Sequence, residues 1–545
     1  MAKTPDISKE ALLREIDRRR TFAIISHPDA GKTTLTEKLL LYGGAVHIAG
    51  EVKARRASRH ATSDWMSIEK ERGISVASSV MQFEHLGLRF NLLDTPGHND
   101  FSEDTYRTLA AADCAVMLVD VAKGVEPQTI KLFEVCRLRK IPIVTFVNKL
   151  DREGKPPLDL LEEIEQVLQI PTSPMTWPVG MGKRFQGVYA RESNTFYKFE
   201  RAEKAGRRAD TVTCELASSE LTDLLGDEAA DELRNDIELL DEAGNPWDED
   251  AFLNGELTPV FFGSAMTNFG VEPFLDRFSK LCPEPRPRPL VDGEQDPRGE
   301  QFSAFVFKIQ ANMDPKHRDR IAFLRICSGR FSRGMGVKHV RTGRKMTLDR
   351  SLSFLAQSRE TVEEAFSGDI LGLWDPGVLR IGDTLAVGKQ VQFEGIPVFS
   401  PEHFVRVRLS DPMKRKQLKK GLEQLSEEGA VQLFQERDQA RVDPLLGAVG
   451  WLQVEVVQHR LKAEYGVNVT MEPLAFKEAR WVFGDDEFDP KKFVRMGSIE
   501  CVYDIEERPL LLFDNEWTRR RCEQKNEGWS FVAAVQPGRR KLGSA

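Results

Sequence analysis

The chain has 545 residues, 30% of them charged and 41% hydrophobic, which is typical of a large globular protein of about three or four domains. The net charge is −8, and the lack of any long apolar run argues against a membrane-spanning protein. Seven scattered cysteines without a Cys-x-x-Cys pair argue against a zinc site or a disulfide framework, and residues 1–20 are too polar for a signal peptide. We therefore expect a cytoplasmic protein.

The charge is distributed unevenly. Residues 200–256 carry 18 acidic and 5 basic side chains, and we interpret them as a helical insertion with exposed faces. Residues 312–350 carry 11 basic and 3 acidic side chains, and 401–422 is a second basic segment. Such basic segments suit either a solvated face or a nucleic-acid contact, and charge alone leaves both open.

The first chemical motif lies between an apolar run at 21–25 and a helical pattern at 35–41. A Gly-Lys-Thr placed between a strand and a helix is the centre of a phosphate-binding loop, whose N–H groups and helix dipole hold phosphate oxygens. Lys32 would reach the β- and γ-phosphates, and the Thr33 hydroxyl would bind Mg²⁺. Ser26 stands where the usual motif has its first glycine.

Three further motifs each follow an apolar strand: Asp-Thr-Pro-Gly at 94–97, Asn-Lys-Leu-Asp at 148–151 and Gly-Ser-Ala at 263–265. They predict GTP as the nucleotide, because the Asp151 carboxylate can accept both donors on one edge of guanine. Asn148 would tie neighbouring loops together, the Lys149 stem would lie over the base, and an N–H near Ala265 would bind the guanine carbonyl.

Strands and helices alternate in the first half of the chain, which predicts an α/β P-loop domain with a parallel-rich sheet covered by helices on both faces. The strands are expected at 21–25, 90–94, 114–120, 141–148 and 259–263, and helices at 127–139 and 158–168. We place an N-terminal helical extension at 1–19 and the GTP-binding domain at 20–282.

A proline-rich stretch at 283–299 is expected to be a stiff linker, followed by an antiparallel β-barrel domain at 300–394 and an α+β domain with a tail at 395–545. The barrel strands are expected at 301–308, 320–327, 334–340, 352–354 and 377–385. In the third domain we expect strands at 403–408 and 431–434 and helices at 414–428 and 450–465. The segment 515–545 has no assigned role.

Taken together, the motifs at 29–34, 71–75, 94–101, 148–151 and 263–265 resemble those of the translational GTPase superfamily. Four stretches (21–28, 63–66, 305–320 and 425–432) are similar to the bacterial GTPase-class peptide chain release factors, the release factor three family. The likeness covers about residues 15–515, and 305–320 is its most specific part.

The resemblance implies a GTPase that hydrolyses GTP to GDP and phosphate when stimulated by the ribosome. It would contact ribosomal RNA and proteins and recycle codon-reading release factors after the peptide has left. We expect a monomer with no membrane partner. Within the basic segments, we expect Lys316, Arg318, Arg320 and the cluster at 414–416 to contact the ribosome. For Arg320 an alternative stays open, in which it pairs with Asp314 or Asp319 and only stabilises the barrel.

The resemblance also implies site roles. Ser75, at the end of 71–75, would complete Mg²⁺ coordination with Thr33, Asp94 would act through a water, and His98 would position the attacking water. The expected catalytic residues are His98 and Lys32. The expected nucleotide-binding residues are Ser26, His27, Pro28, Asp29, Ala30, Gly31, Lys32, Thr33, Thr34, Asp94, Thr95, Pro96, Gly97, His98, Asn148, Lys149, Leu150, Asp151, Ser264 and Ala265.

Other functions stay open at this point. An elongation-factor-like GTPase and a P-loop kinase or transferase share the phosphate loop, and a GTP-sensing scaffold would leave His98 idle. Phosphate release measured with and without ribosomes separates these possibilities.

Overall fold

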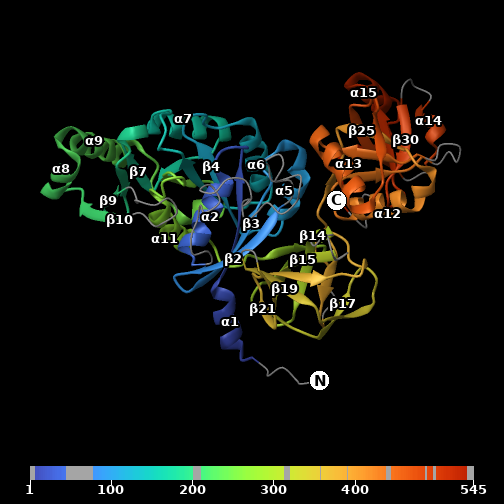
Figure 1. Ribbon diagram of the computed structural model, residues 1–545, viewed down its shortest axis with the longest axis horizontal. Helices are drawn as coiled ribbons and strands as arrows, with labels where there is room; N and C mark the ends of the chain where they lie inside the picture. The colour runs from blue at the N-terminus through green and yellow to red at the C-terminus, as the bar shows by residue number, and fades with distance from the viewer. Residues whose placement is uncertain are drawn as a thin grey trace.

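A computed structural model describes residues 7–44, 78–200, 210–311, 320–355, 358–388, 391–436, 443–484, 488–494 and 499–536. Figure 1 shows three bodies: an α/β body coloured blue to green, a yellow β body below it, and an orange-to-red α+β body to the right of the first and above the second. We refer to them as the first, second and third domains. Within the described ranges, no helix is both long and apolar enough to cross a membrane.

The first domain is built on a seven-stranded sheet of order β2-β3-β1-β4-β5-β11-β6. All neighbours in it are parallel except β2 and β3. The strands are β1 Arg19–Ser26, β2 Ser79–His85, β3 Leu88–Asp94, β4 Cys114–Asp120, β5 Ile143–Asn148, β6 Thr172–Pro174 and β11 Thr258–Phe262.

Helices cover both faces of this sheet, because side chains along each strand alternate between two cores. On β1, Phe22 and Ile24 pack with the helices α2 Lys32–Tyr42 and α11 Val271–Leu281. Ala23 and Ile25 point to the other core. That core is covered by α5 Ser102–Leu109, α6 Pro127–Leu138 and α7 Pro157–Leu168. The carboxyl ends of β1, β3, β5 and β11 therefore meet at one edge.

The acidic segment contains a strand as well as the predicted helices. An antiparallel sheet of β7 Thr176–Val179, β8 Gly187–Ala190, β9 Thr195–Glu200 and β10 Asp210–Glu215 is followed by α8 Ser219–Leu225, α9 Asp227–Ala243 and α10 Glu249–Leu253. In α9 the buried residues Ala230, Leu233, Ile237 and Leu240 have helical spacing, so most of its acidic side chains are exposed. Asp236 is an exception, because it accepts from Trp177 Nε1 at 2.9 Å.

The second domain is an antiparallel sheet of order β18-β17-β23-β14-β15-β22-β19-β20, with β16 and β21 paired beside it. Its strands are β14 Ser303–Ala311, β15 Arg320–Ser328, β16 Arg330–Ser332, β17 Met335–His339, β18 Lys345–Leu348, β19 Ser351–Leu355, β20 Ser358–Thr361, β21 Glu364–Phe366, β22 Ile370–Trp374 and β23 Thr384–Ala386. Figure 1 shows this sheet as a strongly curved body, and its buried side chains form a core of their own. Upstream, β12 Arg288–Leu290 and β13 Gly293–Gln295 form a hairpin inside the stretch expected to be an extended linker.

One strand prediction in this domain was wrong. Of the residues 377–385, only the last two lie in a strand, and the strand β22 just before them was not predicted. The reason is local turn chemistry: the Asp375 carboxylate accepts the N–H groups of Val378 and Leu379, and Gly377 and Gly382 have φ of 97° and 89°.

The third domain has two antiparallel four-stranded sheets, β26-β27-β25-β28 and β30-β31-β29-β32, with β24 paired to β33. Its strands are β24 Val398–Phe399, β25 His403–Leu409, β26 Gln432–Phe434, β27 Leu445–Ala448, β28 Val469–Pro473, β29 Glu478–Phe483, β30 Ile499–Tyr503, β31 Pro509–Phe513, β32 Ser530–Val532 and β33 Ala534–Val535. Its helices are α12 Arg415–Glu427, α13 Trp451–Tyr465, α14 Pro490–Val494 and α15 Glu516–Lys525.

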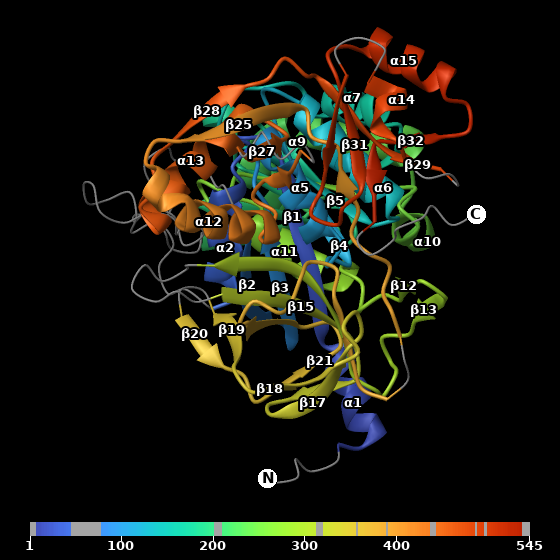
Figure 2. The ribbon, with the colours of Figure 1, turned by 90° about the vertical axis from the view of Figure 1, so that its right-hand side faces the viewer.

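On β25, Val405 and Val407 pack against α12 and α13, whereas Phe404 on the opposite face shares a core with Trp481 of the second sheet. The described part of the C-terminal segment, to which the sequence assigned no role, supplies α15, β32 and β33 to this domain. Figure 2 shows the third domain in front, above the second domain, with the first domain behind.

A buried ion network joins the first and second domains. Arg325 on β15 and Arg288 on β12 both donate to the Asp113 carboxylate, at 2.7 Å for Arg288. Burial lowers the pKa of the Arg325 guanidinium below its usual value, although the neighbouring Asp113 carboxylate opposes this shift. The N-terminal helix α1 Lys9–Asp17 extends this contact by packing Leu12 and Ile16 on Phe366.

Candidate functional site

The phosphate loop connects β1 to α2. Its backbone enters the left-handed region at Asp29 (φ 68°) and at Gly31 (φ 98°), which directly precedes the helix. A Cβ at Gly31 would lie 2.3 Å from Asn148 Nδ2, so only glycine fits this close approach. No side chain caps the N-terminus of α2. Its first N–H groups are therefore arranged to receive an anion.

Lys32 in the first turn of α2 lies beside Asp94 at the end of β3. The Lys32 ammonium is 2.5 Å from Asp94 Oδ1, and both side chains are buried. Thr95, the next residue, donates to the carbonyl of Ile24, which fixes the strand end to β1. Thr33, beside Lys32 on the helix, is half-buried. The sheet thus brings together an ammonium, a hydroxyl and a carboxylate at the mouth of the loop.

Asn148 joins three loops. Its side-chain amide donates to the carbonyl of Ala30 in the phosphate loop at 2.9 Å, and its side-chain oxygen accepts the N–H of Ala265 at 2.9 Å. This is the tie that the sequence predicts. It also means that the Ala265 N–H is engaged by Asn148, so this N–H is not free for the guanine carbonyl.

Two further side chains of the loop that follows β5, Asp151 and Lys149, are held by polar contacts. The Asp151 carboxylate accepts from Ser264 Oγ at 2.6 Å, which holds one of its oxygens in place. Lys149, at φ 71°, places its ammonium on the Asp29 carbonyl and 2.7 Å from Asp120 Oδ2. Asp120 at the end of β4 was not predicted as a site residue, although its position after an apolar strand was a usable signal.

His98 lies in the loop between β3 and α5, directly before the short 3-10 helix Asn99–Phe101. Its Nδ1 is 3.1 Å from Asp100 Oδ1, and its side chain is 39% exposed. Its ring is therefore partly open to solvent. Asp100, whose role sequence reasoning missed, also reaches the third domain, because its Oδ2 accepts the N–H of Leu452 at 2.7 Å.

The remaining predicted residues lie around these groups. The phosphate loop at 26–31 includes buried Ser26, half-buried Pro28 and His27, which is 3.1 Å from Glu126. Thr34 continues α2, and Pro96, Gly97 and Leu150 lie in the loops already described. Ser75 and the stretch 63–66 lie outside the described residues.

Helix α5, which follows His98, contacts both other domains. Lys308 of β14 donates to the Ser78 carbonyl and lies 3.5 Å from Asp104 Oδ2. Burial alone would raise the pKa of Asp104, but Lys308 and the hydrogen bonds from Ser78 bring it below its usual value. Arg107 donates to the carbonyl of Gly429 in the third domain at 3.0 Å.

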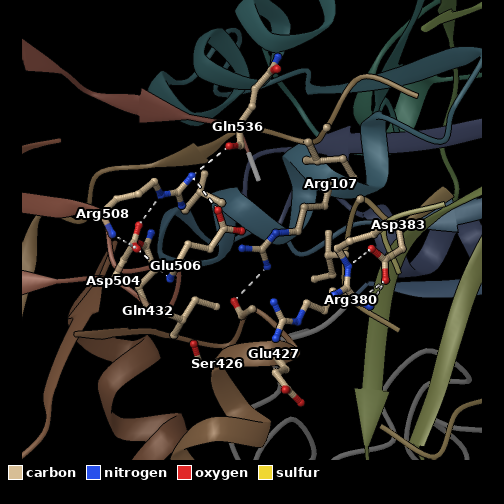
Figure 3. A pocket seen from close by; sticks show the side chains of 18 of the residues that line it. Arg107, Arg380, Asp383, Ser426, Glu427, Gln432, Asp504, Glu506, Arg508 and Gln536 are labelled. Carbon is tan, nitrogen blue, oxygen red and sulfur yellow. Dashed lines mark hydrogen bonds and ion pairs between the residues drawn. The ribbon is translucent and has the colours of Figure 1, made fainter. Parts of the chain in front are cut away.

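Glu103 completes this contact by accepting from Arg107 and from Gln432, each at 2.8 Å, while burial raises its pKa. Beside Arg107 lies a cavity of about 440 Å³ lined by all three domains. Figure 3 shows Arg107 from the first domain, Arg380 and Asp383 from the second, and Glu427, Gln432 and Arg508 from the third around it.

One expected contact residue is in fact part of the fold. Arg320 is buried and paired with Asp375 at 2.9 Å, with Glu427 of α12, and with the Leu379 carbonyl at 2.8 Å. The expectation that Arg320 contacts the ribosome was therefore wrong, and the alternative that it pairs within the fold is supported, with Asp375 and Glu427 as the partners. Lys316 and Arg318 lie outside the described residues, and Arg415 and Lys416 on α12 are exposed.

Three family models match successive parts of the chain. "Elongation factor Tu GTP binding domain" matches residues 17–284, "Elongation factor G domain 2" matches 301–388, and "Class II release factor RF3, C-terminal domain" matches 393–523. Together with the phosphate loop and the Asn148–Asp151 loop, these matches define the class: the chain is a translational GTPase that binds a guanine nucleotide.

Similar proteins of known name show which family of translational GTPases the chain belongs to. A protein of Symbiobacterium thermophilum named "Peptide chain release factor 3" is 58% identical over 527 residues, which cover 97% of this chain and 99% of the relative. The protein of the same name from Microcystis aeruginosa is 54% identical over 96% of each chain. A crystal structure from Thermus thermophilus matches with a TM-score of 0.68 at 25% identity, over 90% of this chain and 72% of that one. The chain belongs to the peptide chain release factor 3 family, whose members act in translation termination.

Proposed function

We propose that this protein works on the ribosome, where it uses GTP binding and hydrolysis to promote the release and recycling of codon-reading peptide release factors. The observation that carries this proposal is the full-length likeness to proteins named "Peptide chain release factor 3", in a chain whose third domain matches the release-factor C-terminal model. The ribosome implies a cytoplasmic location and contacts with ribosomal RNA and proteins. We further propose that the protein acts as a monomer.

The proposed nucleotide site uses the residues that the fold brings to one edge of the sheet. The phosphate loop and Lys32 would hold the phosphates, because the open N-terminus of α2 and the buried ammonium both favour anions. Asp151, held by Ser264, would accept the donors of guanine. Lys149 would lie along the base, and Asn148 would keep the phosphate and base loops in register.

The donor set also suits Mg²⁺. The Thr33 hydroxyl and the Asp94 carboxylate are oxygen ligands of the kind that Mg²⁺ prefers, and both lie next to Lys32. We propose Thr33 as a direct ligand, Asp94 as a ligand through water, and the Ser75 hydroxyl as the third protein group. When bound, the ion would neutralise charge on the phosphates.

His98 is proposed to position the attacking water. It follows the Asp94–Gly97 motif directly, and its partly exposed ring can reach a water at the phosphate edge. Together with Lys32, it forms the proposed catalytic pair.

We keep as our proposal the division of the chain into an N-terminal extension, a GTP-binding domain, a linker, a second domain and a third domain, with the limits 1–19, 20–282, 283–299, 300–394 and 395–545.

The test is His98→Ala, measured in two assays. GTP affinity of the free protein should stay within a few-fold, because His98 is proposed to act on water and not on the bound nucleotide. Ribosome-stimulated GTP hydrolysis should fall by about a hundredfold or more.

A third assay follows dissociation of a labelled codon-reading release factor from ribosomes. The unaltered protein with GTP should accelerate this dissociation. If it stimulates translocation instead, or transfers phosphate to a small acceptor, then the elongation-factor or kinase alternative holds. Normal hydrolysis by the variant would show that His98 is idle.

A further inference from the structure

One carboxylate touches both the proposed catalytic histidine and the third domain. Asp100 Oδ1 lies 3.1 Å from His98 Nδ1, and Asp100 Oδ2 accepts the N–H of Leu452 at 2.7 Å. Leu452 belongs to the first turn of α13, a helix of 15 residues with no side-chain cap of its own. Asp100 therefore caps, from the first domain, the N-terminus of a third-domain helix.

The fit between these two elements is close. A Cβ at Gly450, the residue before α13, would lie 2.1 Å from the Asp100 carboxyl carbon. The Gly450 backbone has φ −153° and ψ 167°, an extended conformation open to any residue, so glycine is needed here for space and not for its backbone. The side chain of Asp100 is only 16% exposed, which leaves little room for another position.

A carboxylate fixed in this way can set the tautomer of the imidazole. When Nδ1 carries the proton, it donates to the carboxylate and Nε2 is left as an acceptor, as in the Ser-His-Asp arrangement. An Nε2 acceptor is what the proposed role requires, since the attacking water must donate a hydrogen to it. The backbone N–H of Asp100 donates to Nδ1 at 3.3 Å, a hydrogen bond that favours the opposite tautomer, so the Asp100 N–H and the Asp100 carboxylate compete for this ring nitrogen.

We propose that Asp100 is a positioning residue for His98, and that the docked third domain holds Asp100 in place through the N-terminus of α13. This inference rests on the proposed role of His98. It also implies that the arrangement of the domains affects the rate of GTP hydrolysis through the Asp100 side chain. The contact joins residues 352 positions apart in the sequence, so it exists only in the folded, docked protein.

The experiment compares Asp100→Asn and Gly450→Ala with His98→Ala in single-turnover GTP hydrolysis, with and without excess ribosomes. In Asp100→Asn the amide oxygen can still accept from Leu452, but the amide nitrogen faces Nδ1 and favours the wrong tautomer. We expect both variants to lose about tenfold or more in the hydrolysis rate while GTP affinity stays within a few-fold. Gly450→Ala should act because its methyl group and the Asp100 carboxylate cannot keep their present places.

Gly528→Ala is the matched control, because it lies in the same domain and its Cβ would meet nothing within 4 Å. It should hydrolyse GTP normally. The second readout is the ¹⁵N spectrum of the histidine rings, assigned by difference from His98→Ala among the nine histidines. We expect an Nδ1–H tautomer in the unaltered protein and an Nε2–H tautomer in Asp100→Asn.

The outcomes separate the two hypotheses. If His98→Ala abolishes hydrolysis but Asp100→Asn is unaffected, or if the unaltered protein already has the Nε2–H tautomer, the positioning role is overturned while the proposed function stands. If His98→Ala itself hydrolyses GTP normally, the proposed role of His98 fails. Lower thermal stability of Asp100→Asn with an unchanged rate and tautomer would show that Asp100 only caps α13, which also overturns the proposal.

Discussion

Replacing Asn148 by alanine should weaken nucleotide binding about a hundredfold. The side chain is buried and makes two hydrogen bonds of 2.9 Å, one to the Ala30 carbonyl and one from the Ala265 N–H. An unmade hydrogen bond at a buried group costs about 1 to 3 kcal/mol, so the two together amount to about 2 to 6 kcal/mol. Because alanine leaves room for a water molecule, we expect a loss in the lower half of this range, about 3 kcal/mol. This loss corresponds to roughly a hundredfold lower nucleotide affinity.

The assay is titration of fluorescent GTP and GDP analogues with the purified protein. Asn245→Ala is the matched control, because its amide also bridges two segments, Glu165 at 2.8 Å and the Thr172 carbonyl at 3.2 Å, away from the phosphate loop. It should lower thermal stability without changing nucleotide affinity. Asn148→Asp should behave like Asn148→Ala, because a carboxylate would oppose the Ala30 carbonyl. Unchanged affinity in both Asn148 variants would refute the view that this side chain holds the loops for the nucleotide.

Three other outcomes are expected. Asp151→Asn should lose about 3 kcal/mol of GTP-binding free energy and should prefer xanthosine nucleotides, which carry a carbonyl in place of the guanine amine. Equal GTP affinity of the variant and the unaltered protein would remove Asp151 from the site. Alanine at both Arg415 and Lys416, which are exposed on α12, should reduce the slope of log ribosome affinity against log salt concentration by roughly one to two. Alanine at Lys491 and Lys492 of α14 should leave this slope unchanged. Asp113→Ala leaves Arg325 and Arg288 without their shared carboxylate and should destabilise the folded protein by about 3 to 5 kcal/mol. This loss should be measured as a lower melting temperature, and the melting temperature of Asp113→Asn should fall less.

The nucleotide motifs could be located from the sequence because each depends on residues within a few positions of one another, placed after a strand. The apolar runs predicted the strands β4 and β5, and parallel strands deliver their carboxyl ends to a common edge. The tie made by Asn148 follows from the same reasoning, since its partners Ala30 and Ala265 lie in two of the predicted loops.

Contacts between distant segments could not be predicted in this way. Arg320 was expected to face a partner because it lies in a basic stretch, but its carboxylates come from residues 55 and 107 positions later. A charge count along the chain cannot show which charges the fold pairs. The same limit applies to Asp113 and Arg325, which are 212 positions apart and meet only when the first two domains are assembled.

The segment from Asp100 to Arg107 is the place where the three domains meet the proposed catalytic loop. The second domain reaches it through Lys308, and the third domain reaches it through Gly429 and Leu452. Any shift of the third domain must therefore break or remake contacts made by residues directly after His98. Since coupling between two equilibria is reciprocal, a nucleotide state that moves this segment must also favour one domain arrangement over another. The fold thus offers a direct path by which the state of the nucleotide and the position of the third domain can influence each other.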